Sequence, residues 1–169
     1  STEFHCSNKD ELILHAVMGV LTELEELLDN HLYEKDDTNV LEEVGDVTWY
    51  LAILGRELDI DYNLHKMKYF PTQMETVIDT TKLSLKLLDI MKKKLYYNKP
   101  IDFDKFIETT EKIILNINGY AHLNNIDIEK CFDVNISKLK ARYGDKFTSE
   151  RAINRDLNTE RKILEDNNE

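Results

Sequence analysis

The chain has 169 residues, 41% hydrophobic and 33% charged, so it is apolar enough to fold as one globular domain and is not a disordered chain. Acidic side chains outnumber basic ones by 33 to 22, and the net charge of −11 argues against general nucleic-acid binding, which depends on basic surfaces. The chain has neither an apolar run of about 18 residues nor a signal-peptide pattern. We therefore expect a cytoplasmic protein without a membrane segment or a membrane partner.

The spacing of the apolar residues is helical along most of the chain, and only two prolines and five glycines occur. The sequence therefore predicts an all-α fold. We expect a first helix over about 8–30 and a second over about 38–58, with Thr38 or Asn39 as the cap of the second. The short polar break between them, 30–39, favours an antiparallel helix pair.

The rest of the chain continues the helical pattern to about residue 143, and we expect one antiparallel helical bundle over 1–169. The predicted elements are a short segment over 62–70 that Pro71 ends, then helices over 73–97, 103–123 and 127–143. The remainder, 146–169, is charged and has little apolar periodicity. It is predicted to form an arm or a peripheral helix.

Two pairs of carboxylates stand on the first two helices. Glu23 and Glu26, and then Glu43 and Asp46, are three residues apart, a spacing that places each pair on one face of its helix. For one such pair alone, a solvated surface is the simpler interpretation. Four carboxylates that converge repel one another unless a cation lies between them, and an all-oxygen cluster suits Mg²⁺ or Mn²⁺ better than zinc. The sequence therefore predicts a metal centre.

Other residues near the second acid pair are candidates for the same site. Gly45 costs a helix about 1 kcal/mol relative to alanine, so we expect it to allow close approach of a neighbouring backbone or a ligand. Tyr50 lies one turn beyond Asp46 and is predicted to face the site. For Trp49 and His15, packing in the core is an open alternative.

A weak internal repeat relates the two halves of the chain. Segments 27–35, 58–61 and 63–68 resemble segments 87–99, 125–128 and 135–140 in the same order. In this alignment Glu23 falls on Leu83, Glu26 on Lys86, Glu43 on Thr109 and Asp46 on Lys112. If the acids served only solubility, nothing would require all four to vanish together. We interpret 9–70 as a catalytic copy, 73–143 as a degenerate copy and 146–169 as a C-terminal arm.

Three motifs accompany the acid pairs: His15-Ala16-x-x-Gly19, Gly45-Asp46-Val47-x-Trp49-Tyr50-Leu51 and Asn135-x-x-Lys138-Leu139-Lys140-Ala141-Arg142-Tyr143. Together with the acid pairs, this series resembles the all-α nucleoside triphosphate pyrophosphohydrolases. These form the MazG-like superfamily, which includes dimeric dUTPases and dCTP pyrophosphatases. The usual chain of that family is shorter and forms a tight dimer. A duplicated chain could imitate that dimer by itself, and a homodimer of this chain is the alternative.

The resemblance implies Mg²⁺-dependent hydrolysis of a nucleoside triphosphate between its α and β phosphates, which yields a monophosphate and pyrophosphate. The four acids would hold Mg²⁺, with Mn²⁺ as a substitute, and either Glu23 or Glu26 would act as the base toward water. The implied substrate-binding residues are His15, Trp49, Tyr50, Asn135, Lys138, Arg142 and Tyr143, with Arg155 as a further cation. The base and sugar preference of the site stays open.

Two other functions compete with this interpretation. A ferritin-like di-iron bundle also places carboxylates between helices, but it requires Glu-x-x-His pairs, and the chain has none. A non-enzymatic acidic helical module for protein interaction is the second alternative. It predicts that the protein binds no metal and is unaffected by the loss of Glu43.

Overall fold

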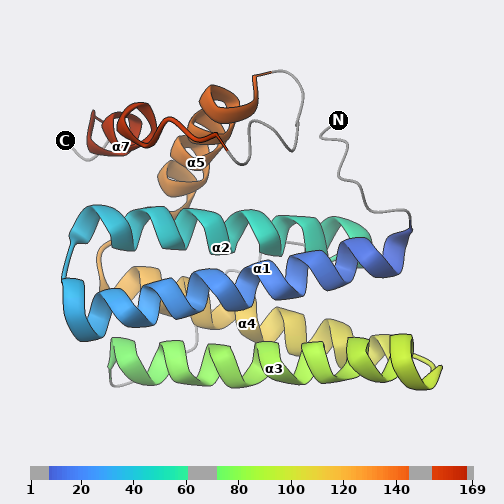
Figure 1. The fold of residues 1–169 in the computed structure, drawn as a ribbon. Helices are drawn as coiled ribbons and strands as arrows, with labels where there is room; N and C mark the ends of the chain where they lie inside the picture. Colours follow the sequence, from blue (N-terminus) through green and yellow to red (C-terminus); the bar gives the residue numbers. More distant parts are fainter. Residues whose placement is uncertain (1–7, 61–71, 145–153, 167–169) are drawn as a thin grey trace.

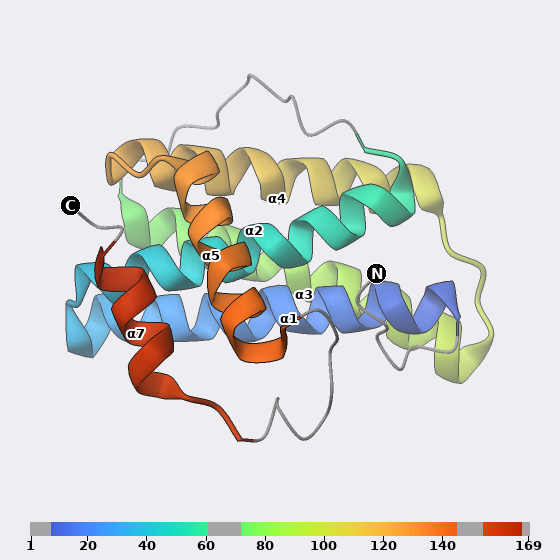
Figure 2. The ribbon, with the colours of Figure 1, turned by 90° about the horizontal axis from the view of Figure 1, so that it is seen from above.

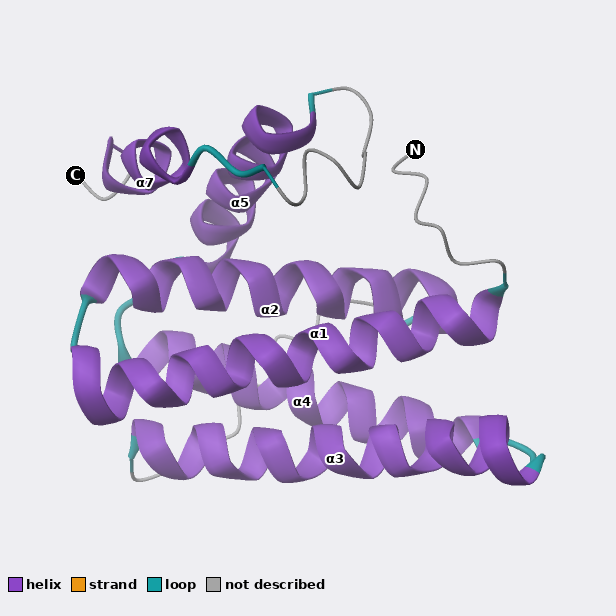
Figure 3. Ribbon diagram, in the orientation of Figure 1, coloured by secondary structure: helices purple, strands orange, loops and turns teal. Residues whose placement is uncertain are grey.

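The computed structural model describes residues 8–60, 72–144 and 154–166, and these ranges contain helices and turns but no strand (Figure 3). The predicted all-α fold class is therefore confirmed. The predicted segment over 62–70, including the part of the repeat at 63–68, lies outside the described residues. None of the described helices combines the length and the apolar character needed to cross a bilayer.

The first two helices are joined more tightly than the sequence suggested. Helix α1 (Lys9–Asp29) continues directly into a short π-helix, η1 (Asn30–Glu34), and α2 (Asp37–Leu58) follows after only two residues. Lys35 makes this turn with a positive φ of 54°. The predicted cap of α2, Thr38 or Asn39, is wrong. The Asp36 carboxylate accepts hydrogen bonds from the backbone N–H groups of both residues, at 2.9 and 3.4 Å, and so caps the helix itself.

The later helices match their predicted ranges closely. Helices α3 (Gln73–Tyr97) and α4 (Phe103–Leu123) begin and end where the apolar periodicity placed them. Helix α5 (Ile128–Tyr143) begins one residue later than predicted, because Asp127 is its cap. Within the C-terminal arm, α7 (Leu157–Asp166) is a short amphipathic helix that buries Leu164. A peripheral helix was one of the two predicted forms of this segment.

Among the described elements, the long helices α1, α2, α3 and α4 run side by side, and the shorter helices α5 and α7 cover α2 (Figure 1). Helix α1 contacts α2 and α3, while α4 contacts α3 and α2. Helix α5 crosses the outer side of α2 at a steep angle and α7 lies beside α5, as the view from above shows (Figure 2). The outer face of α2 is thus covered by segments from the C-terminal part of the chain.

The core is formed where α1, α2, α3 and α4 face one another. Its fully buried side chains include Ile13, Leu24, Leu27, Leu51, Leu54, Leu87, Met91, Phe106 and Ile113. Each such side chain contributes about 1.5–3 kcal/mol to folding. Two large apolar side chains of α3, Ile78 and Leu85, stay outside this core and are 43% and 50% exposed. They lie on the side of α3 that is turned away from α1 and α4.

Gly19 on α1 provides the space in which the ring of Tyr50 from α2 lies. A Cβ atom at Gly19 would stand 2.3 Å from Tyr50 Cε1, closer than any real contact. We expect Gly19→Ala to displace the ring and to destabilise the fold by about 1–3 kcal/mol, as overpacking does. Chemical denaturation measures this change.

The matched background is Tyr50→Ala, in which the ring is absent. There Gly19→Ala should instead stabilise the protein by about 1 kcal/mol, because alanine is the better helix former. An equal effect in both backgrounds would contradict the proposed contact between Gly19 and the ring.

Candidate metal centre

Three of the four predicted acids meet at the interface of α1 and α2. Ligand oxygens of Glu23, Glu43 and Asp46 all lie within 4.8 Å of one another. Glu43 is 6% exposed, and its Oε2 atom has no hydrogen-bond partner among the described residues. Buried polar atoms are almost always paired, so an unpaired carboxylate oxygen within an acidic group is consistent with a cation-binding site. An all-carboxylate donor set suits Mg²⁺ or Mn²⁺.

The electrostatics of this group follow from burial and crowding. Burial raises the pKa of Glu43 to about 10, and the charges of Glu26, Glu23 and Asp46 act in the same direction. The pKa of Glu23 is raised to about 7. Burial is the largest cause, and the charges of Asp46 and Glu26 add to it. A divalent cation would relieve both effects, because it favours the ionised form of each carboxylate that it binds.

Glu26, the fourth predicted acid, lies at the edge of the group. The residue is exposed as a whole, but its carboxyl group is partly buried. This partial burial, and then the charge of Asp46, raises the pKa of Glu26. It lines a cavity of about 280 Å³ together with Glu42, Glu43 and Arg155. Glu26 thus faces an open space next to the three clustered carboxylates, with one positively charged side chain on the rim of that space.

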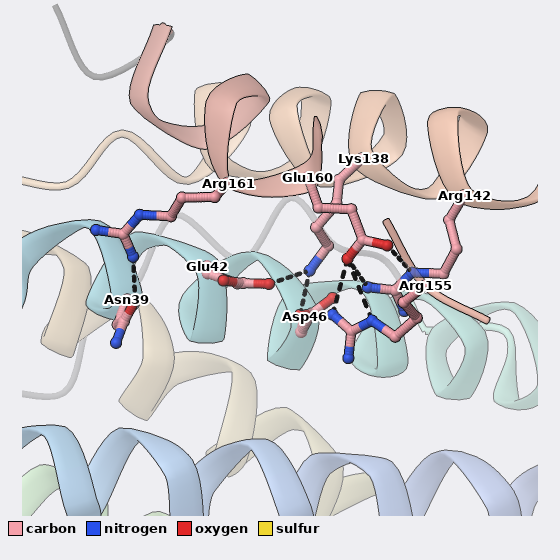
Figure 4. Close-up of polar contacts among 8 residues, drawn as sticks. All are labelled: Asn39, Glu42, Asp46, Lys138, Arg142, Arg155, Glu160 and Arg161. Carbon is pink, nitrogen blue, oxygen red and sulfur yellow. Dashed lines mark hydrogen bonds and ion pairs between the residues drawn. The ribbon is translucent and has the colours of Figure 1, made fainter. Parts of the chain in front are cut away.

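Lys138 reaches the acids from α5 (Figure 4). Its side chain is 1% exposed, and its Nζ atom donates to Asp46 Oδ2 at 2.5 Å and to Glu42 Oε1 at 3.0 Å. Glu42 was not among the predicted site residues. A signal for it existed, since Glu42 stands four residues before Asp46 and therefore shares its face of the helix.

Gly45 lets α5 approach α2 beside the acids. A Cβ atom at Gly45 would lie 3.1 Å from the carbonyl oxygen of Cys131 and 3.2 Å from Cβ of Asn135. The expectation that Gly45 accommodates a neighbouring backbone is therefore confirmed. Asn135 is 2% exposed, and neither amide atom of its side chain has a hydrogen-bond partner among the described residues.

Aromatic rings lie next to the acids, around Tyr50. The ring of His15 meets that of Tyr50 edge to face at 5.6 Å between centroids, and Trp49 does so at 5.0 Å. Burial raises the pKa of Tyr50 to about 12, with further contributions from the charges of Glu23 and Asp46. Tyr50 thus stands beside the acidic group, while His15 and Trp49 contact its ring.

The predicted arginines meet on a carboxylate that the sequence analysis missed. Glu160 of α7 is 3% exposed and accepts hydrogen bonds from Arg142 at 2.8 and 2.5 Å, and from Arg155 at 2.8 Å (Figure 4). Arg142 also lies over the ring of Tyr143, 5.7 Å from its centroid. Glu160 carried no sequence signal, because its partner on α5 is 18 residues away along the chain.

Comparison of the chain with models of protein families, with curated proteins and with solved structures finds no match. Inference about the site therefore depends on its own geometry and on the motifs of the sequence.

Among the described residues of the second half of the chain, there is no equivalent acidic group. Of the positions that the repeat aligns with the acids, Leu83 and Thr109 are 8% exposed, whereas Lys86 and Lys112 face solvent. Lys112 pairs with Glu108 on its own helix at 2.6 Å. Within the described ranges, Glu23, Glu43 and Asp46 form the one group of three or more side chains suited to holding a metal.

The raised pKa values predict how the metal-free protein responds to pH. Glu23 and Glu43 hold protons in the folded state with pKa values of about 7 and about 10, above their values in the unfolded chain. Their contribution to stability is complete at low pH and is lost as pH rises toward those values. In chelator-treated protein, the melting temperature should therefore fall from about pH 5 to about pH 8.

Mg²⁺ should counteract this loss, so that it raises the melting temperature more at about pH 8 than at about pH 5, where it competes with protons. The Glu43→Gln variant serves as the control, and its melting temperature should depend less on pH. A metal-free melting temperature that stays constant or rises over this range would contradict the proposed crowding of carboxylates.

The contact of Glu160 with two arginines predicts how α7 is held. Glu160→Gln leaves Arg142, whose side chain is 12% exposed, without its ionic partner, so the attachment of α7 should weaken by about 2 kcal/mol or more. Trypsin cleavage at Arg161 or Lys162 should become faster, because cleavage needs local opening of the helix. The matched variant is Glu165→Gln, whose partner Arg161 is partly exposed; it should change stability by less than about 0.5 kcal/mol. Equal cleavage rates would contradict this role of Glu160.

Proposed function

We propose that this chain is a Mg²⁺-dependent nucleoside triphosphate pyrophosphohydrolase of the MazG-like type, which converts a nucleoside triphosphate into its monophosphate and pyrophosphate. The observation that carries the proposal is the group formed by Glu23, Glu43 and Asp46, whose ligand oxygens lie within 4.8 Å of one another. An adjoining cavity with Arg155 on its rim gives further support. An acidic group needs a metal to accept an anionic substrate, because carboxylates alone repel phosphate.

In this proposal the three clustered acids hold Mg²⁺, or Mn²⁺ as a substitute. When bound, the metal neutralises phosphate charge and lowers the pKa of a bound water. Glu26 is the carboxylate left to accept a proton from the attacking water, because it lies outside the group of three and faces the cavity. The water oxygen bonds to the α phosphorus, and pyrophosphate leaves with the bridging oxygen.

The positively charged side chains have a distinct role in this proposal. Arg142 and Arg155 converge on one carboxylate, so they are already placed to hold an anionic group such as the leaving pyrophosphate. The rings of His15, Trp49 and Tyr50 form one contact series that would hold the base or the sugar. Asn135, with its unpaired buried amide, would offer hydrogen bonds to the substrate.

We further infer that the chain is a duplicated unit with one working half. The pairs α1·α2 and α3·α4 have the most extensive mutual contacts, and the second pair carries lysines where the repeat aligns Glu26 and Asp46. A chain of this kind would supply by itself the helices that a dimer of shorter chains supplies. Control of nucleotide pools or removal of damaged nucleotides is the biological role that fits such an activity.

Product analysis tests the proposed reaction. The protein is incubated with Mg²⁺ and a panel of canonical and modified ribo- and deoxyribonucleoside triphosphates, and the products are separated. We expect monophosphate and pyrophosphate. Loss of a group that only orients a metal ligand lowers activity roughly 10–100-fold. Glu43→Ala removes a proposed ligand itself, so it should lower the rate by more than that. The exposed acid Glu25 of α1 provides the matched control, Glu25→Ala, which should retain most of the activity.

Release of orthophosphate in place of pyrophosphate would contradict the proposed bond cleavage. The absence of turnover with every triphosphate, in Mg²⁺ and in Mn²⁺, would favour the acidic interaction module instead.

A further inference from the structure

Lys138 is the lysine that the fold buries beside the acidic group. Among the described lysines it alone is buried, with 1% of its side chain exposed. Its ammonium group contacts the carboxylates of both Asp46 and Glu42. The fold therefore places the ammonium of Lys138 directly against the acidic group.

Glu42 and Asp46 form a second carboxylate pair next to the group of three. The two residues stand four positions apart on α2, and Asp46 belongs both to this pair and to the group of three. Two carboxylates so placed could bind a cation of their own, but the ammonium of Lys138 lies between them at 3.0 and 2.5 Å. The nearby arginines, Arg142 and Arg155, are held by Glu160.

We propose that Lys138 takes the place of a second divalent cation, so that the centre binds one Mg²⁺ or Mn²⁺ per chain before substrate arrives. This inference rests on the proposed function, because it assumes that the acidic group holds a metal. Repulsion between an ammonium and a divalent ion a few ångströms apart is strong in a partly dry site. A second ion could therefore enter only with the negative charge of a substrate.

The test is a titration of the metal-free full chain with Mn²⁺, without nucleotide, followed by calorimetry and by electron paramagnetic resonance. Calorimetry counts the ions bound per chain. Resonance separates an isolated ion from a magnetically coupled pair, which needs ions about 3.5–4 Å apart as in two-metal sites. We expect one uncoupled Mn²⁺ in the unaltered protein. In Lys138→Met we expect two coupled ions, the second bound at Mn²⁺ concentrations at which the unaltered protein still holds only one.

A matched variant controls for the loss of one positive charge. Lys112 on α4 is half exposed and pairs with Glu108, and Lys112→Met should keep one uncoupled Mn²⁺. Helical content, measured by circular dichroism, shows that Lys138→Met is folded. If Lys138→Met does not fold, the Glu42→Gln variant provides the test of the inference. This variant should keep one Mn²⁺ with an affinity within about threefold of the unaltered protein, because Lys138 already occupies Glu42.

Each outcome bears on the inference. A coupled pair of ions in the unaltered protein, a folded Lys138→Met that still binds one ion, or loss of Mn²⁺ binding in Glu42→Gln would overturn it and leave the proposed function standing. An unaltered protein that binds no Mn²⁺ at millimolar concentration would overturn both. Because binding is measured without turnover, a failure of the proposed reaction is distinguished from a failure of the role of Lys138.

Discussion

Repulsion among the carboxylates of α1 and α2 is the constraint on which the rest of the site depends. Glu23, Glu43 and Asp46 bring ligand oxygens within 4.8 Å of one another, and Glu43 is almost fully buried. Such an arrangement is costly unless protons or cations balance it. The fold supplies one cation of its own, Lys138, and raises the pKa of Glu43, which favours the neutral, protonated form of this side chain.

Helix α5 can supply that lysine only because it approaches α2 closely. Gly45 leaves no side chain between the two helices, and the backbone of Cys131 fills the space. Lys138 lies two turns further along α5 than Cys131 and so meets the acids. The absence of a side chain at Gly45 thus determines which charged group of α5 faces the candidate centre. The same contact buries Asn135, whose side-chain amide atoms have no hydrogen-bond partner among the described residues.

The sequence predicted those features that depend on spacing within one helix. Glu43 and Asp46 share one face of α2, and the helices over 73–97 and 103–123 follow directly from apolar periodicity. Contacts between distant helices were harder to predict. Glu160 pairs with Arg142 across a connection that periodicity does not describe, and the capping role of Asp36 depends on a turn only two residues long. The direction in which Ile78 and Leu85 point depends on which side of α3 has neighbours.

The pairing of Arg142 and Arg155 with Glu160 sets a condition for the binding of any external anion to these arginines. Two bare guanidinium groups would capture small anions indiscriminately, chloride and orthophosphate included. Here an external anion would have to exchange with a resident carboxylate that is 3% exposed and already accepts several hydrogen bonds. Binding then depends on the difference between the binding free energies of the external anion and of Glu160, and not on either free energy alone. An exchange of this kind favours multiply charged ligands and filters out the abundant monovalent ones.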